Sequence, residues 1–152
     1  MGGKPLPGLS QHIEAVRHFN RFYTREVGLL RKTFLDTPWT LGEMRVLYEI
    51  HTAPGILAKE ICAKLGLDPA YLSRMISSFI KQGLLRREPS TDDARQLHLF
   101  LTDIGEARVE VTSKRQYEQT RQSLSHLSDE EQDTLTSAMR TIEQLLTKGR
   151  DA

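Results

Sequence analysis

The sequence predicts a mainly α-helical protein with one small β-hairpin, and three observations support this fold class. Apolar residues recur three or four positions apart along most of the chain, as in helices that bury one face. Leu97, Leu99 and Leu101 instead follow the two-residue period of a strand. Capping and turn residues separate these segments. With 152 residues, 38% hydrophobic and 27% charged, the chain suits one compact domain with an added interaction segment.

The first helix is predicted over residues 13–34. Residues 1–10 contain scattered Gly and Pro, so we expect a flexible N-terminus there. They hold no continuous apolar stretch, which argues against a signal peptide or a membrane span and favours a cytoplasmic location. The apolar face of the helix is made of Ile13, Val16, Phe19, Tyr23, Val27, Leu30 and Phe34. Asp36, Thr37 and Pro38 end it.

Two further helices and a tight turn come next. Residues 40–43 are a capping box that starts a helix running to about His51. After turn residues 52–55, a short helix over residues 57–65 is ended by Gly66. Asp68 as N-cap and Pro69 in the first turn then start a helix that runs to about Gln82. Its predicted buried side consists of Leu72, Met75, Ile76, Phe79 and Ile80.

A hairpin and two helices complete the chain. Residues 84–88 and 97–101 are the predicted strands, joined by a turn-rich loop. Thr102 is the expected N-cap of a long helix that runs to about Ser125. Residues 128–131 form another capping box, which starts the last helix. The residues predicted to be buried on that helix are Leu135, Ala138, Met139, Ile142, Leu145 and Leu146.

This order of elements is a helix-turn-helix followed by a wing, and it predicts double-stranded DNA as a partner. A helix of about 14 residues is about 21 Å long and fits a major groove about 12 Å wide. Arg74 can donate two parallel hydrogen bonds to guanine, whereas Lys81 lies far enough along the helix to meet phosphate. The predicted contacts on this helix are Ala70, Ser73, Arg74, Ser77 and Lys81.

The hairpin carries the other predicted DNA contacts. Asp93 can bond the backbone of the loop, and Arg95 can project from the tip into the minor groove. Arg86 and Arg87 add positive charge beside the loop. Residues 1–102 hold 14 Lys and Arg against 10 Asp and Glu, a net +4, whereas residues 103–152 hold 7 against 10, a net −3. The charge distribution therefore agrees with a DNA-facing first part.

These residues together resemble the MarR family from about residue 13 to 147. The resemblance lies in Leu67-Asp68, Leu72-Ser73-Arg74, Lys81-Gln82-Gly83-Leu84-Leu85, Asp93-Ala94-Arg95 and Leu101-Thr102-Asp103-Ile104-Gly105. It implies a winged helix-turn-helix over residues 37–101 that reads DNA through Ser73, Arg74 and Ser77, with Arg95 at the wing tip and Asp93 ordering the wing. Gln96 after the wing arginine and Pro69 at the helix start depart from the family pattern.

The resemblance also implies a homodimeric repressor that binds a pseudo-palindromic operator and responds to a small-molecule effector. Residues 11–36 and 102–148 would form the dimerisation region. The apolar stripes of the first and last helices agree, because a small winged domain cannot cover them alone. Within the family, residues 18–24 and 72–74 look most like regulators associated with GNAT acetyltransferases. A regulatory protein-contact module of an acetyltransferase system is therefore the alternative function.

The remaining candidate sites favour structural roles. The five His residues show no metal-ligand spacing, and no nucleophile, base and orienting group form a pattern, so we expect no metal, no cofactor and no enzyme activity. Cys62, on an apolar helix face, is expected to be a buried structural residue, with oxidation sensing as the alternative. Arg17, Arg21 and Arg25 are expected to be solvated, and Tyr23 to pack, although this stripe could also bind an anionic effector.

Overall fold

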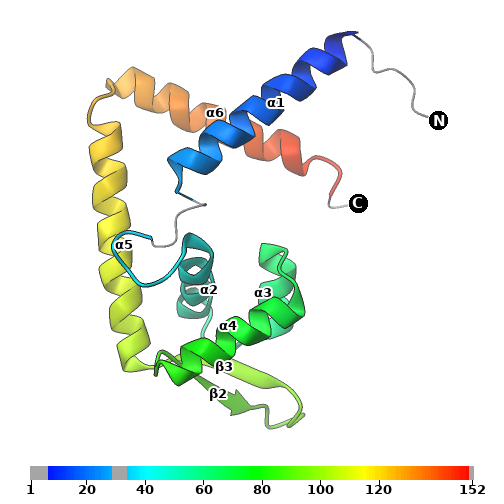
Figure 1. Ribbon diagram of the computed structural model, residues 1–152, viewed down its shortest axis with the longest axis vertical. Coiled ribbons are helices and arrows are strands. Elements are labelled where there is room, and N and C mark those ends of the chain that lie inside the picture. Colours follow the sequence, from blue (N-terminus) through cyan, green and yellow to red (C-terminus); the bar gives the residue numbers. More distant parts are fainter. Residues whose placement is uncertain (1–6, 29–33, 151–152) are drawn as a thin grey trace, which may run out of the picture. The chain divides into compact units, whose positions relative to one another are not determined.

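The computed structural model describes residues 7–28 and 34–150 (Figure 1). The chain divides into two compact units, Met1–Thr112 and Ser113–Ala152. The helices are α1 (Pro7–Glu26), α2 (Leu41–Thr52), α3 (Ala58–Leu65), α4 (Pro69–Lys81), α5 (Asp103–Leu124) and α6 (Asp129–Thr147). The strands are β1 (Ile56–Leu57), β2 (Leu85–Pro89) and β3 (Leu97–Leu101). This is the mainly helical fold with a small sheet that the sequence predicts. None of the described helices combines the length and apolar character needed to span a membrane.

The bounds of the first helix differ from the prediction. Helix α1 begins at Pro7 and ends at Glu26, so the predicted range 13–34 was wrong at both ends. Proline is favoured in a first helical turn, and Gly28 takes the left-handed φ of 70° at which helices end. Leu30 lies outside the described residues. Phe34 is not on this helix, and its side chain packs against the core of the first unit.

The predicted caps of the other helices are confirmed. Thr40 Oγ1 accepts a hydrogen bond from Glu43 N at 3.1 Å, and Glu43 Oε1 accepts one from Thr40 N at 3.3 Å. Ser128 and Glu131 form the same reciprocal pair at the start of α6. Thr102 Oγ1 accepts from Gly105 N at 3.1 Å. Each cap satisfies N–H groups that have no partner within the helix.

The sheet has one more strand than the sequence predicts. Its order is β1-β3-β2 with both pairs antiparallel, so the expected two-stranded hairpin forms only part of it. In β1, Ile56 pairs with Leu99 and Leu57 with His98. A strand of two residues is too short to show a period, and its partner lies far along the chain. The sequence pattern around residue 57 therefore indicated only the start of α3.

The core of the first unit lies between α2, α4 and the sheet. Its largest fully buried side chains are Phe79, Leu47, Ile50, Ile61, Leu72, Leu99, Val46 and Val109. On α6, in contrast, no residue is buried, so the burial predicted for its apolar stripe was wrong for this chain.

Candidate nucleic-acid interface

The turn between α3 and α4 has the predicted geometry. Gly66 takes a left-handed φ of 65° as the C-cap of α3, and its N–H donates to Cys62 O. Asp68 Oδ2 then accepts from Tyr71 N at 3.0 Å, and Pro69 occupies the first turn of α4. A glycine is needed at the turn because other residues are strained at this φ. The two caps set the direction in which α4 leaves the turn.

Helix α4 separates a buried side from an exposed side. Leu72, Met75, Ile76 and Phe79 are buried, as predicted, and Ile80 is half-buried. The five residues predicted to contact DNA are all exposed: Ala70, Ser73, Arg74, Ser77 and Lys81. At 3.6 residues per turn these positions share one side of the helix. The structure therefore places small, polar and basic groups together on the solvent side of α4.

The side chain of Gln82, at the end of α4, makes two hydrogen bonds that the sequence analysis missed. Gln82 Oε1 accepts from Trp39 Nε1 at 3.1 Å, and Gln82 Nε2 donates to Ser78 Oγ at 3.0 Å. Trp39 stands before α2, 43 positions from Gln82. No local pattern could have revealed a contact over this separation. Gln82 thus links the start of α2 to the last turn of α4.

The loop of the hairpin is ordered by Asp93. Asp93 Oδ1 accepts from Arg95 N at 3.0 Å, as expected for an Asp that bonds the backbone of a turn. Asp93 O accepts from Gln96 N at 3.0 Å, and Gln96 O accepts from Ser90 N at 2.8 Å. Asp93 and Arg95 are both exposed, and Gln96 is half-buried. The backbone at the tip is therefore held while the Arg95 side chain stays accessible.

The two arginines of β2 have different surroundings. Arg86 forms an ion pair with Glu88, and its guanidinium lies 4.6 Å from the centre of the Phe100 ring. Arg86 is paired with Phe100 in the ladder, which explains this cation–π contact. Arg87 points to the other face of the strand, because successive strand residues alternate. Arg87 forms no ion pair with any residue that the structure describes.

The buried carboxylate of Glu49 links α2 to α3 through an ion pair with Lys64. Only 4% of the Glu49 side chain is exposed, and Lys64 Nζ lies 2.6 Å from its Oε2. Arg45 Nε lies 3.5 Å from Oε1. Removing a carboxylate from water is costly unless a cation stays close. The pair therefore holds α3 against α2, a role that the sequence analysis did not predict.

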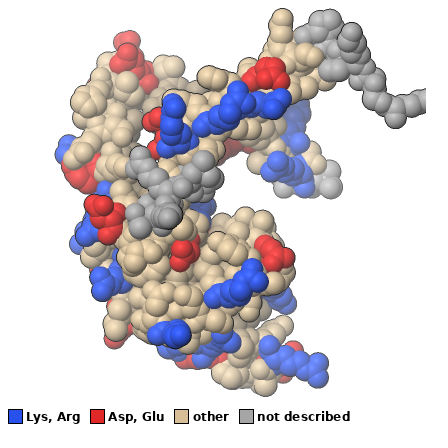
Figure 2. Space-filling model, in the orientation of Figure 1, with Lys and Arg blue, Asp and Glu red and all other residues tan. Residues whose placement is uncertain are grey.

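Basic side chains are frequent over the region that holds α4 and the hairpin. Figure 2 shows Lys and Arg there, with Asp and Glu between them. The excess is moderate, as the net charge of residues 1–102 indicates. Such a surface attracts a phosphate backbone without being uniformly positive.

The other singled-out residues have ordinary structural contacts. Cys62 is half-buried and packs against the core. Tyr23 is stacked on Phe19, with ring centres 5.5 Å apart, and Arg17 pairs with Glu14. His51 Nδ1 lies 2.5 Å from Glu106 Oε2. Within the described ranges, no three His, Cys, Asp or Glu residues are grouped as metal ligands would be.

Comparison with known proteins supports this arrangement. The sequence profile of the MarR family matches residues 39–97. The uncharacterized HTH-type transcriptional regulator YybA of Bacillus subtilis is 22% identical over 126 residues, which cover 78% of this chain and 84% of that protein.

Three solved structures have a similar fold. A MarR family transcription regulator superposes with a TM-score of 0.72 at 23% identity, over 92% of this chain and 91% of its own. A mutant MarR from E. coli complexed with operator DNA superposes with a TM-score of 0.70 at 24% identity, over 87% of this chain and 95% of that chain. Streptococcus pneumoniae FabT in complex with DNA superposes with a TM-score of 0.66 at 20% identity, over 91% of this chain and 94% of that chain. These similarities show that the fold is a winged helix with flanking helices.

Proposed function

We propose that this chain, whose residues 39–97 form a winged helix of the MarR family, is a sequence-specific DNA-binding regulator of transcription that acts as a homodimeric repressor. One observation carries the proposal: α4 follows a capped glycine turn and exposes Ser73, Arg74 and Ser77 on one side. The relatives are named as regulators, so nothing in them supports the alternative of a module in an acetyltransferase system.

In this proposal α4 lies in the major groove with its N-terminal half toward the bases. Arg74 would donate two hydrogen bonds to one guanine, while Ser73 and Ser77 contact bases or phosphate. Ala70 allows close approach, and Lys81 would meet a phosphate. FabT in complex with DNA and mutant MarR complexed with operator DNA support DNA as the partner, because their folds match this chain over 87% of it or more.

The hairpin would contact the DNA beside the groove occupied by α4. Arg95 would enter the minor groove, whose narrow regions attract arginine. Asp93 would order the loop, and Arg87 would add a phosphate contact. Arg86 would stay over Phe100 and contribute its charge at longer range. The hairpin therefore adds affinity more than sequence preference.

Replacing Arg95 by Ala is expected to weaken binding to all DNA sequences by a similar factor. Loss of one charge contact lowers the slope of log K against log salt concentration by about one unit. Fluorescence anisotropy with the best fragment and a scrambled one, at several salt concentrations, measures both quantities. Arg140→Ala on α6 removes the same charge from an exposed site and should change neither the DNA affinity nor the salt slope. A changed base preference in Arg95→Ala would assign this residue to base recognition instead.

Two exposed apolar surfaces support a homodimer. On α1, Phe19 and Tyr23 are 40% and 44% exposed, and on α6, Leu145 and Leu146 are 65% and 59% exposed. The full set on these helices is Leu9, Ile13, Val16, Phe19, Phe22, Tyr23, Met139, Ile142, Leu145 and Leu146. Apolar faces of this kind are typical of subunit interfaces. A two-fold dimer would place two α4 helices about 34 Å apart on a pseudo-palindrome.

Leu145→Glu is expected to dissociate this dimer. Burying an unpaired carboxylate in an apolar interface should raise the dimer dissociation constant by about 100-fold, equal to roughly 3 kcal/mol. Analytical ultracentrifugation measures the constant directly. Gln144→Glu adds the same charge on the opposite side of α6 and should leave the dimer intact. If Leu145→Glu stayed fully dimeric, α6 would not form the interface.

Selection of genomic DNA fragments by the purified protein, followed by titration of the best fragment at several salt concentrations, tests the function as a whole. An enriched pseudo-palindrome bound by two copies is the expected result. Only weak, salt-sensitive and sequence-indifferent binding would contradict it. A small-molecule effector that prefers one spacing of the two α4 helices would then release the operator.

A further inference from the structure

Tyr71 exposes an aromatic ring in the first turn of α4. Within α4, which the structure describes in full, it is the one large hydrophobic side chain that is exposed, at 45%. Its ring neither stacks on a described aromatic ring nor lies under a described cation. A single exposed aromatic residue is ordinary on a protein surface, so its place on the helix decides what it can contact.

Tyr71 lies beside the side of α4 that the proposed function assigns to DNA. At 3.6 residues per turn, Tyr71 is about 60° around the helix from Arg74 and about 4.5 Å nearer the N-terminus. The N-terminal residues of a recognition helix meet base edges, and helical side chains point toward the helix N-terminus. Since base pairs are about 3.4 Å apart along DNA, Tyr71 can reach the base pair next to the one that Arg74 contacts.

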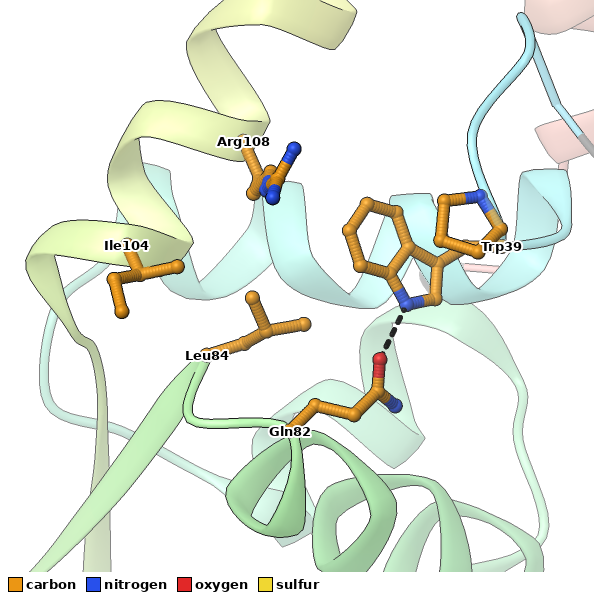
Figure 3. Close-up of a pocket in the computed structure, with 6 residues that line it drawn as sticks. Trp39, Gln82, Leu84, Ile104 and Arg108 are labelled. Carbon is orange, nitrogen blue, oxygen red and sulfur yellow. Dashed lines mark hydrogen bonds between the residues drawn. The ribbon is translucent and has the colours of Figure 1, made fainter.

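Contacts at both ends of α4 fix the backbone that carries Tyr71. At the start, Tyr71 N donates to Asp68 Oδ2 at 3.0 Å, and Pro69 restricts the first turn. At the end, Gln82 Oε1 accepts from Trp39 Nε1 at 3.1 Å (Figure 3). A cavity of about 350 Å³ adjoins this bond and is lined by Pro38, Trp39, Gln82, Leu84, Ile104 and Arg108. A tyrosine side chain has only two torsions to order, so a contact made by Tyr71 costs little conformational entropy.

The chemistry of the ring favours one group in the major groove. All four base pairs present hydrogen-bond donors or acceptors there, and thymine also presents an apolar group, its 5-methyl. The neighbouring residues Ser73, Arg74 and Ser77 are polar and suit hydrogen bonds to bases or phosphate. None of these three side chains offers an apolar surface as large as a tyrosine ring. The thymine methyl group is therefore the part of the groove that Tyr71 complements and its neighbours do not.

We infer that Tyr71 is a specificity-determining residue that recognises the 5-methyl group of a thymine one base step from the guanine bound by Arg74. The ring covers the methyl group, and the hydroxyl stays in water. The inference rests on the proposed function, because it needs α4 in the major groove. It adds a base contact that the sequence analysis did not predict, and it requires a thymine next to this guanine in each half-site.

Exchanging single thymines of the selected DNA fragment for deoxyuridine tests the contact, because the exchange removes only the methyl group. Fluorescence anisotropy titrations give the affinity of each fragment for the wild type, Tyr71→Ala and Tyr71→Phe. One exchange in a half-site should weaken binding by the wild type about fourfold, the factor expected for burial of one methyl-sized group. Tyr71→Ala should bind the thymine and deoxyuridine fragments equally. Tyr71→Phe should keep the fourfold difference, because the hydroxyl takes no part.

Tyr48→Ala is the matched control. Tyr48 is as exposed as Tyr71, at 46%, but it lies on α2. This variant should keep both the affinity of the wild type and the fourfold difference. Neither tyrosine belongs to the hydrophobic core, so the variants should unfold at the wild-type temperature.

The remaining outcomes separate this inference from the proposed function. If no exchange weakened the wild type, or if Tyr71→Ala kept the fourfold difference, the inference would be overturned while specific DNA binding stood. Equal loss of affinity in Tyr71→Ala and Tyr71→Phe, without a methyl effect, would overturn it too and assign the Tyr71 hydroxyl to a phosphate. A protein that selects no specific fragment at all would refute the proposed function, and the inference with it.

Discussion

Arg74→Ala should cost about 1–3 kcal/mol of specific DNA binding and remove preference at one base position. Arg74 is exposed on the first half of α4 and forms no ion pair with any described residue, so its guanidinium is available for a base. Two parallel hydrogen bonds to guanine cannot be replaced by a methyl group. Binding to unrelated DNA should fall much less, because it loses only the attraction of one positive charge to the phosphate backbone.

Competition binding against the selected fragment and its single-base variants measures this loss of preference. Arg140→Ala, which removes an arginine from α6, is the matched control and should bind like the wild type. Both variants should unfold at the wild-type temperature, because Arg74 contributes nothing to the core. Unchanged discrimination among the base variants by Arg74→Ala would show that another face of the protein reads the sequence.

Gly105→Ala should destabilise the winged domain strongly. A Cβ at this position would lie 2.1 Å from the carbonyl oxygen of Leu84 and 3.3 Å from Leu101 Cβ. The Leu84 oxygen cannot simply move away, because it accepts a hydrogen bond from Thr102 N at 3.0 Å. Leu84 and Leu101 are both buried. Relief of the clash would therefore shift backbone and core together, at a cost of about 1–3 kcal/mol or more.

Thermal unfolding at fixed protein concentration is the measurement, and the midpoint should fall by roughly 5–10 °C. Gly42→Ala is the control. Gly42 is also in a helix, but its added Cβ would meet only Thr40 Oγ1 at 3.8 Å. Alanine is the better helix former by about 0.8–1.0 kcal/mol, so this variant should be neutral or more stable. A Gly105→Ala protein as stable as the wild type would mean that α5 does not pack this closely on Leu84.

Local sequence signals were enough to predict most of the helices and the exposed side of α4. The caps at Thr40, Asp68 and Ser128 and the turn at Gly66 act within a few residues, so their effect can be read along the chain. The 3.6-residue period then separates the buried and exposed sides of α4. The hairpin loop follows the same principle, since Asp93 bonds a backbone group two residues away.

Contacts between distant residues depended on the tertiary structure. β1 forms because β3 is folded beside it, and the buried Glu49 carboxylate has a cation next to it because α3 brings Lys64 Nζ to 2.6 Å from Oε2. The cavity beside Trp39 needs α2, α4 and α5 together. Local periodicity carries the preferences of neighbouring residues, whereas these features depend on which surfaces meet after the chain has folded. The sequence by itself therefore determined most of the helices, the hairpin and the exposed side of α4. The tertiary structure decided the third strand, the cation beside the buried Glu49 carboxylate and the cavity.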